Sequence, residues 1–226
     1  MLPTEDESTG DARPATNRSP DNEAARLASE GDAALAELFS SHRDRLERMV
    51  AFRLAPQIRG RIDAADVIQE AYLRIARRVQ EYLERPTVTF YVWMRQQTLQ
   101  VLIDLQRTQF REARSPAREV RLAADQDSDA TSYSIACRLI DAIQSPSQVA
   151  SKNEDMRAIQ DALDSMNRVD REVLALRHFE QLSNAQVAEI LNLSPTAASN
   201  RYVRAAERLG QIMTKVERDR RNRTET

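Results

Sequence analysis

The spacing of hydrophobic residues along the chain predicts helices and gives no sign of strands. In the segment from Asp63 to Leu83, apolar residues recur every three or four positions and would form one buried face. These residues are Val67, Ala71, Ile75, Val79 and Tyr82. No stretch shows the alternation with a period of two that is typical of a half-buried strand. The pattern therefore predicts an all-α protein.

Breaks in this helical pattern divide the chain into two blocks. The first block runs from about residue 22 to 107, with interruptions at Gly31, at 55–60 and at 84–87, and the second begins near residue 151. The polar, acidic stretch between the blocks predicts a flexible linker, although its segment "YSIACRLIDAI" could form one short helix. We expect two small helical domains, an N-terminal helical bundle and a C-terminal helix-turn-helix. The expected ranges are 1–22 for a disordered acidic tail, 23–112 for the first domain, 113–150 for the linker, 151–217 for the second domain and 218–226 for a basic tail.

Two short helical patterns near the C-terminus carry signals for their ends. Ser183 and Gln186 have the spacing of a capping box, and Asn192 suits the left-handed turn that ends a helix. Ser194 followed by Pro195 is typical of the start of a second helix. The inward face of that helix would carry Ala198, Tyr202, Ala205 and Leu209. Two helices across so tight a turn indicate a helix-turn-helix.

The opposite face of the second helix suits contact with DNA. Small polar residues let a helix enter the major groove, and arginines can reach bases or phosphates. The expected contacts are Thr196, Ser199, Asn200, Arg201 and Arg204, with Val203 among them. The alternative for this segment taken alone is an ordinary helical hairpin whose arginines are solvated.

Composition excludes several classes of protein. The single Cys137 cannot form an internal disulfide and suits a reducing cytoplasm, so we expect a cytoplasmic protein. No stretch approaches the roughly 20 apolar residues of a membrane span, and the N-terminus lacks the apolar core of a signal peptide.

With 33 Lys and Arg against 35 Asp and Glu, the net charge of -2 argues against indiscriminate coating of nucleic acid. Basic clusters at 107–121 and 215–223 remain as local candidates for phosphate contact.

The sequence does not favour an enzyme. His42 and His178 are far apart, and neither is accompanied by a nucleophile and an orienting group. No glycine-rich loop that could hold a phosphate is present. We therefore expect no catalytic residues, no metal and no cofactor.

A second face of the helix predicted at 63–83 carries Asp66, Gln69, Glu70 and Leu73, which we call the acidic ridge. These positions are spaced at i, i+3, i+4 and i+7 and would lie on one side of the helix. An acidic face that contains a leucine suits docking to a basic partner better than simple solvation.

The helix expected at 90–114 combines aromatic and basic residues. It begins with Phe90, Tyr91 and Trp93 and continues to Arg107 and Arg111. Such a helix could stack bases and hold a phosphate backbone. Burial in the core is the more common role for aromatic residues, and we favour it for Phe90 and Trp93.

Two segments resemble bacterial sigma factors. "REVLALRHFEQLS", "VAEILNLS" and "RYVRAAERL" resemble the C-terminal promoter-binding domain of these factors, a module that many response regulators share. "DAADVIQEAYL" resembles the clamp-binding motif D-x-x-D-[LV]-[VI]-Q-E-x-[FY]-L of the extracytoplasmic-function group of sigma-70-type sigma factors, and every anchor of that motif is present. Over residues 35–209 the chain thus resembles this group.

The resemblance implies a transcription initiation factor. A region-2-like first domain would bind the clamp of core RNA polymerase through the acidic ridge and capture the non-template single strand of the minus-ten element. The residues implied for minus-ten DNA are Gln100, Asp104, Arg107 and Arg111. A region-4-like second domain would bind the minus-35 duplex. The linker would thread the RNA-exit path of the polymerase, where Asp125, Asp127 and Asp129 could mimic nucleic acid.

The sequence also departs from the family pattern. Gln97, Leu99 and Gln100 replace residues common in the minus-ten helix, which leaves open the bases that it contacts. Ser199 stands where lysine is common, and Ala206 and Glu207 replace arginines. A weaker electrostatic contact with the minus-35 element would follow.

Two other functions remain as alternatives. A stand-alone helix-turn-helix transcriptional regulator would use only the C-terminal domain, and it leaves the acidic ridge unexplained. A protein whose helices bind only protein partners is the second alternative, and DNA binding by residues 151–226 would count against it. An anti-sigma factor or another regulator is a further expected partner.

Overall fold

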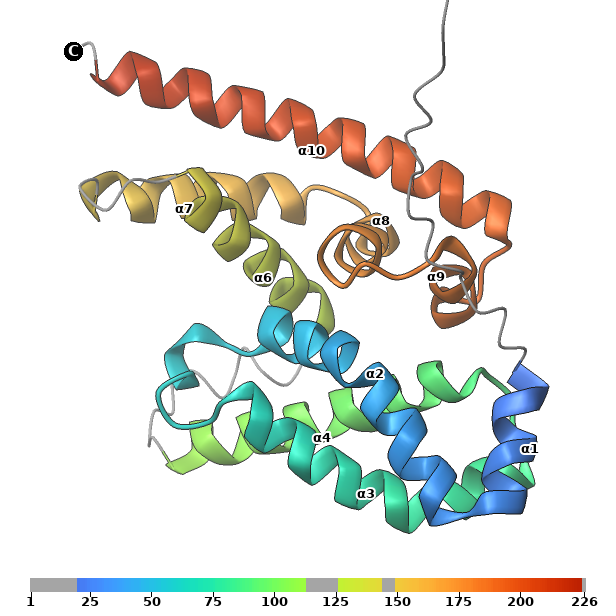
Figure 1. The fold of residues 1–226 in the computed structure, drawn as a ribbon. Helices are drawn as coiled ribbons and strands as arrows, with labels where there is room; N and C mark the ends of the chain where they lie inside the picture. The colour runs from blue at the N-terminus through green and yellow to red at the C-terminus, as the bar shows by residue number, and fades with distance from the viewer. Residues whose placement is uncertain (1–19, 113–125, 144–148, 225–226) are drawn as a thin grey trace, which may run out of the picture.

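The computed structural model describes residues 20–112, 126–143 and 149–224, and every regular element in these ranges is helical (Figure 1). The predicted all-α class is confirmed. The N-terminal half contains helices α1 (Pro20–Glu30), α2 (Asp32–Arg53), η1 (Pro56–Ile58), α3 (Ala64–Glu84) and α4 (Phe90–Glu112). The remainder contains α6 (Gln126–Ile143), α7 (Val149–Asp164), α8 (Arg168–Leu174), the π-helical turn η2 (Ala175–Phe179), α9 (Asn184–Leu191) and α10 (Pro195–Thr224).

The helices of the N-terminal half are separated at the three predicted interruptions. Gly31 lies between α1 and α2 with φ at 59°, a left-handed conformation that glycine adopts without a steric penalty. Helix α3 begins with a capping box in which Asp63 and Asp66 each accept from the other's backbone amide. The capping box fixes the start of α3, which carries the acidic ridge.

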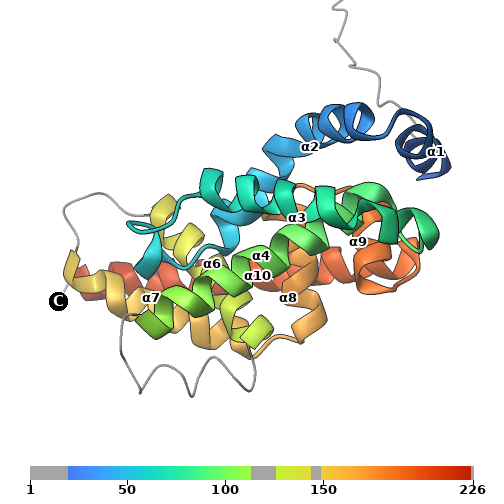
Figure 2. The same cartoon turned by 90° about the horizontal axis from the view of Figure 1, so that it is seen from below.

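The core of the N-terminal half forms where the apolar spacing predicted it. Val67, Ala71 and Ile75 of α3 are fully buried, and Val79 and Tyr82 complete the same face. This face packs against α2 and α4 (Figure 2). Helix α1 also contacts α2, α3 and α4. The opposite side of α3 remains open.

The region predicted as a linker is partly helical. Residues 113–125 and 144–148 lie outside the described residues, but α6 occupies 126–143 and is longer than the single short helix considered from the sequence. Ile135, Ala136 and Ile140 are fully buried, and α6 packs against α2, α7 and α8. The expectation of a flexible connector is therefore corrected for this stretch, because its apolar residues fall on one face and enter the core.

The C-terminal half contains the predicted helix-turn-helix. Ser183 and Gln186 form the capping box of α9, and Asn192 ends that helix with φ at 51°. Helix α10 continues to Thr224, so residues 218–224 extend this helix instead of forming a separate tail. At the other end of the chain, residues 20–22 of the predicted acidic tail belong to α1, and residues 1–19 lie outside the described ranges.

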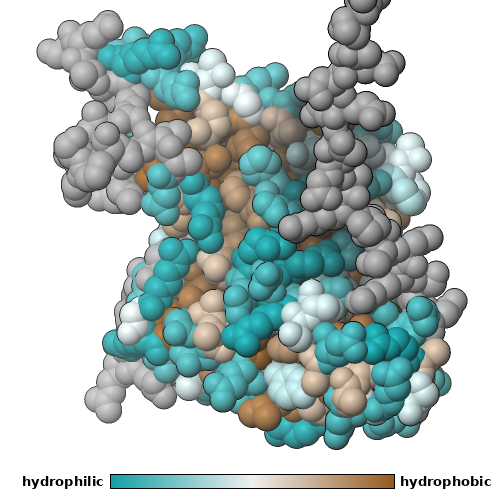
Figure 3. All heavy atoms as spheres, viewed as in Figure 1, coloured by the Kyte–Doolittle hydropathy of each residue, from teal (hydrophilic) through white to brown (hydrophobic). Residues whose placement is uncertain are grey.

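The two halves share one hydrophobic core. Val173, Leu176, Leu182 and Val187 belong to the same buried cluster as the apolar residues of α2, α3 and α4. A second cluster joins Phe52 of α2 to α6, α7, α8 and α10, and the ring of Phe52 stacks on that of Phe179 with centroids 4.9 Å apart. In Figure 3 hydrophilic residues cover most of the visible face, and hydrophobic residues show mainly beneath α10. The N-terminal bundle and the helix-turn-helix are thus docked on each other.

We predict that Ile140→Ala lowers the free energy of unfolding by about 2–4 kcal/mol, because Ile140 is fully buried and the shortened side chain leaves a cavity. Denaturant unfolding followed by circular dichroism measures this change. The neighbouring Leu139 is only partly buried, so Leu139→Ala provides a control with a smaller loss. If each variant lowers the free energy of unfolding by less than about 0.5 kcal/mol, α6 is a solvated segment.

Candidate nucleic-acid and protein-binding surfaces

The acidic ridge forms an open surface along α3. Asp66, Gln69 and Glu70 are exposed, and 47% of Leu73 is accessible to solvent although it is a large apolar residue. Among the large apolar residues that the structure describes, Leu73 and Val203 are the exposed ones. One carboxylate oxygen of Asp66 accepts from the Asp63 amide, so this side chain is held in place at the start of the helix. The structure thus brings the four predicted residues together on one accessible face.

The predicted minus-ten residues form an exposed stripe on α4. Gln100, Asp104, Arg107 and Arg111 are spaced by four, three and four positions and are all exposed. Asp104 accepts from the Gln100 amide at 2.8 Å and from the Arg74 guanidinium of α3 at 3.0 Å. This ion pair connects the stripe to the helix that carries the acidic ridge. Arg114, Arg118 and Arg121 of the basic cluster noted in the sequence lie outside the described residues.

The aromatic residues at the start of α4 belong to the core. Phe90 is fully buried and Tyr91 almost so, while Trp93 is half-buried. The rings of Phe90, Trp93 and Tyr82 contact one another with centroids 5.2 to 5.8 Å apart. The favoured core role of Phe90 is confirmed, and Trp93 packs at the edge of the same aromatic cluster.

The recognition face of the helix-turn-helix is accessible. Within α10, Ala198 and Ala205 are buried as predicted, while Tyr202 and Leu209 are partly buried. The start of the helix is fixed because Ser194 Oγ accepts from the Ala197 amide. The exposed residues on the opposite face are Thr196, Ser199, Asn200, Val203 and Arg204.

Arg201 is placed differently from the other predicted DNA contacts. Its guanidinium donates to Asp170 of α8 at 2.7 Å, and the side chain is about one-third exposed. The Asn184 side chain similarly donates to the Pro195 carbonyl and joins α9 to α10. Arg201 thus braces the domain in this structure, and its contact with DNA stays a prediction.

Sequence reasoning missed a buried charge cluster where the two halves meet, formed by Arg53, Arg95, Glu172 and Glu180. Both oxygens of Glu180 accept from Arg95, at 2.8 and 2.9 Å, and one also accepts from Arg53 at 2.7 Å. Arg53 donates to Glu172 as well. Glu180 has no exposed side-chain surface, and Arg95 has 4%. A charged residue within the otherwise apolar start of α4 was the available signal.

The surroundings of Glu180 favour its charged form. Burial alone would raise the pKa of its carboxyl, but the charges and hydrogen bonds of Arg95 and Arg53 outweigh burial and lower the pKa from 4.5 to about 2. Burial lowers the pKa of Arg53, yet Glu172 and Glu180 together raise it above its ordinary value. Glu180 and Arg53 are therefore both charged at neutral pH.

Further contacts that involve Arg45 and Glu189 join α9 to the N-terminal half. The Arg45 guanidinium lies 3.8 Å above the ring of Tyr91 and donates to the side-chain oxygen of Gln186, which also completes the capping box of α9. The carboxylate of Glu189 accepts from the backbone amide and the hydroxyl of Thr89 at the start of α4. These contacts fix α9 against the N-terminal half.

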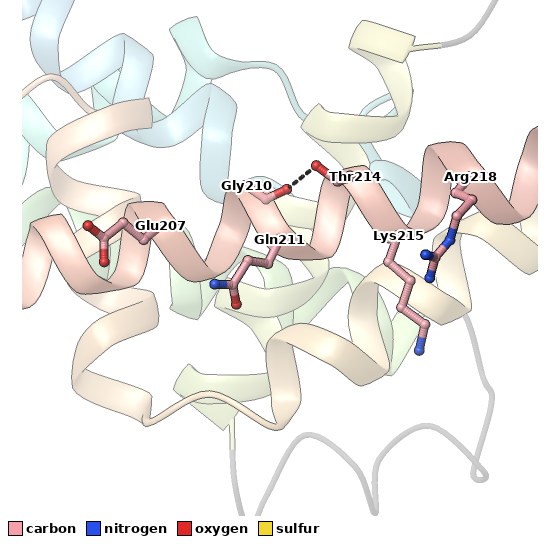
Figure 4. A pocket seen from close by; sticks show the side chains of 6 residues that line it. All are labelled: Glu207, Gly210, Gln211, Thr214, Lys215 and Arg218. Atoms are coloured by element: carbon pink, nitrogen blue, oxygen red, sulfur yellow. Dashed lines mark hydrogen bonds between the residues drawn. The ribbon is translucent and has the colours of Figure 1, made fainter.

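A shallow hollow on the C-terminal half of α10 offers no chemistry of its own. Figure 4 shows that its lining comes from this one helix, so the hollow is an open surface and not an enclosed cavity. The lining residues are Glu207, Gly210, Gln211, Thr214, Lys215 and Arg218. Among the described residues, no group of His, Cys, Asp or Glu could hold a metal ion, and no helix is long and apolar enough to cross a membrane.

We predict that the free energy of unfolding falls as the pH drops from about 4.5 toward 2, because the native Glu180 carboxylate resists protonation while the unfolded one does not. A group with a lowered pKa stabilises the folded state above its ordinary pKa, and Glu180 contributes about 3 kcal/mol that is lost over this interval. Denaturant unfolding at a series of pH values measures the change.

The variant Glu180→Gln should flatten that profile between pH 4.5 and 2. Glu81→Gln is the control, since Glu81 is exposed and its pairing with Arg78 is screened by solvent. If the free energy of unfolding of wild type and of Glu180→Gln changes equally with pH, the pH dependence does not come from Glu180.

Comparison with known proteins agrees with the helix-turn-helix geometry. Residues 156–209, from the second half of α7 to the middle of α10, match the family model for sigma-70, region 4. No curated protein matches the sequence. A solved structure of CnrH in complex with the cytosolic domain of CnrY is similar at 19% identity, covering 85% of this chain and 96% of that chain with a TM-score of 0.46. The chain therefore carries a sigma-70 region 4 domain over these residues, and the resemblance of its C-terminal segment to that domain is confirmed.

Proposed function

We propose that the chain is an RNA polymerase sigma factor of the extracytoplasmic-function type. It binds core RNA polymerase, recognises the minus-35 and minus-ten promoter elements and promotes DNA opening. The observation that carries this proposal is the acidic ridge, because a region 4 domain alone would also fit a stand-alone regulator. The ridge is exposed, contains an accessible leucine and lies on a helix tied to the α4 stripe by the Arg74 and Asp104 pair.

The ridge supports docking to a basic surface of the polymerase clamp. Asp66 and Glu70 supply negative charge, and the exposed Leu73 supplies apolar area that contact with a partner would bury. Gln69 lies between them and can both donate and accept hydrogen bonds. Such a mixture gives orientation from the charges and affinity from the apolar contact.

The two DNA-binding surfaces suit different forms of DNA. The exposed face of α10 has small polar residues near its N-terminus, which allow the helix to enter the major groove of the minus-35 duplex. The α4 stripe presents Arg107 and Arg111 for the phosphates of a separated strand, with Gln100 available for a base. Extruding a base costs a few kcal/mol of stacking, which contacts along α4 would offset. The proposal assigns no bond chemistry to the chain.

We predict that the double variant Asp66→Asn, Glu70→Gln loses most of its binding to core RNA polymerase, because it removes two negative charges from the ridge. Asparagine keeps an acceptor oxygen for the Asp63 amide, so the capping box is preserved. Co-elution of the purified chain with core polymerase from its own organism measures binding.

The matched control for this variant is Glu81→Gln, Glu84→Gln, which removes the same charge from the other end of α3. Equal co-elution of both double variants would show that the ridge is not the docking surface. If the wild type does not co-elute, the stand-alone regulator becomes the leading function.

We predict that Asn200→Ala weakens binding to a selected duplex by roughly 5- to 150-fold, the effect of losing a base contact worth about 1–3 kcal/mol. The duplex is obtained by selection from a random pool with the wild-type chain, and fluorescence anisotropy measures affinity. Gln211→Ala, at an exposed neutral position farther along the same helix, is the control and should reduce affinity little. An unchanged affinity for Asn200→Ala would exclude this part of α10 from base contact.

A further inference from the structure

The C-terminal half of α10 has two faces of different character. Its inward face packs against the cluster formed by α6, α7 and α8, and it carries Leu209, Ile212, Met213 and Val216. The opposite side, which we call the outward face, carries the six exposed residues that line the hollow in Figure 4. The lining contains no residue of another described element. The outward face is therefore open to a partner.

Gly210 lies in the middle of the outward face and has no evident role in the packing of its own chain. A side chain at this position would meet no atom within 4 Å. Glycine inside a helix is destabilising relative to alanine, so its presence here calls for another reason. Thr214 follows one turn later, and its hydroxyl donates to the Gly210 carbonyl at 3.0 Å. Two small residues one turn apart allow a second helix to approach closely.

Charges of opposite sign lie toward the two ends of the outward face. Glu207 is at one end and Arg218 at the other, and the helix rise of 1.5 Å per residue places them about 16 Å apart along the axis. Within the described part of the chain, neither side chain takes part in an ion pair. Both charges are therefore available to a partner that carries the reverse arrangement.

A second copy of α10 in the antiparallel direction carries that reverse arrangement. When the two-fold axis passes between residues 212 and 213, Glu207 lies opposite the partner's Arg218, and each such pair occurs twice. The other opposed pairs are Gln211 with the partner's Thr214, and Lys215 with the partner's Gly210. An amide can donate to the threonine hydroxyl, and the lysine stem can lie over the glycine. One axis thus pairs all six residues of the outward face.

We propose that the chain forms a reversible antiparallel homodimer through the outward face of α10. A contact between two single helices is smaller than the roughly 1,200 Å² of a stable complex. The dissociation constant should therefore be on the order of 10 µM. Salt should weaken the dimer, because its ion pairs lie at the surface.

Duplex phosphates fit the outward face less well than a second helix. From Asn200 to Arg218 the helix extends about 27 Å, more than twice the roughly 12 Å width of the major groove. Arg218 is therefore outside the groove when Asn200 faces its bases. Glu207 lies between them and would repel the phosphates.

Dimerisation would also cover part of the recognition face. Asn200 and Glu207 are about two turns apart and lie on the same side of α10. In the antiparallel pair, the partner's last turns lie over Val203 and Arg204. The dimer and the complex with minus-35 DNA therefore exclude each other. This exclusion alone rests on the proposed function.

Charge reversal tests the pairing in the full chain. Sedimentation velocity from about 1 to 100 µM should show a monomer that becomes a dimer in the parent. Glu207→Arg and Arg218→Glu should each weaken association by about tenfold or more, because like charges then face each other twice. An equimolar mixture of these two variants should form a heterodimer, since both opposed pairs are again attractive.

Two further variants separate the contact from general effects. Glu84→Arg changes the net charge by the same amount at an exposed position of α3 and should leave association at the parental level. Gly210→Leu should abolish the dimer through its bulk while circular dichroism shows an unchanged helical signal, because leucine is a better helix former.

Several outcomes would overturn the dimer. A parent that remains monomeric at about 100 µM excludes it at the expected affinity. A dimer that persists in both charge reversals, or the absence of a heterodimer in their mixture, excludes this face. If Arg218→Glu weakens binding to the selected duplex at nanomolar concentration and leaves association unchanged, the outward face contacts phosphates instead.

The selected duplex also tests the exclusion. Added in excess to the parent at about 100 µM, it should convert the dimer to complexes with one chain per duplex. Duplex bound to an intact dimer overturns the exclusion. Failure of the proposed function is seen separately as absent co-elution with core polymerase, while sedimentation of the free chain still decides whether the dimer exists.

Discussion

The packing of the whole chain depends on Glu180 lying between Arg53 and Arg95. The carboxylate belongs to the region 4 domain, while the two guanidinium groups belong to α2 and α4. Because the site is buried, each charge is tolerated only while its partners are present. Around this contact the apolar residues of both halves merge into one core, with Val173 and Leu176 beside residues of the N-terminal bundle. A polar contact thus determines how two hydrophobic surfaces are aligned.

The predicted functional surfaces lie away from this contact. The acidic ridge and the α4 stripe lie on the solvent side of their helices, and the recognition face of α10 also remains exposed. The contacts between halves come instead from the other sides of α2 and α4 and from α9. Docking therefore leaves all three predicted surfaces accessible to solvent.

Charged residues contribute differently to stability depending on whether they are exposed or buried. Exposed pairs such as Arg78 and Glu81 are screened by water and contribute little to stability. In the buried cluster, the charges and hydrogen bonds of Arg95 and Arg53 outweigh the effect of burial and lower the pKa of Glu180 to about 2. Arg201 is intermediate, since its partly exposed pair with Asp170 stabilises the domain that carries the recognition face.

The sequence by itself determined the helices and the residues on each of their faces. The apolar spacing of α3, the capping box of Ser183 and Gln186 and the left-handed Asn192 are local signals, so they predicted α3, α9 and the start of α10 correctly. Only the tertiary structure decided that α6 enters the core, that Arg201 braces α8 and that Glu180 clamps α2 to α4. These contacts join residues 31 to 127 positions apart. Their energies arise when water is excluded between distant segments, and no local pattern records that event.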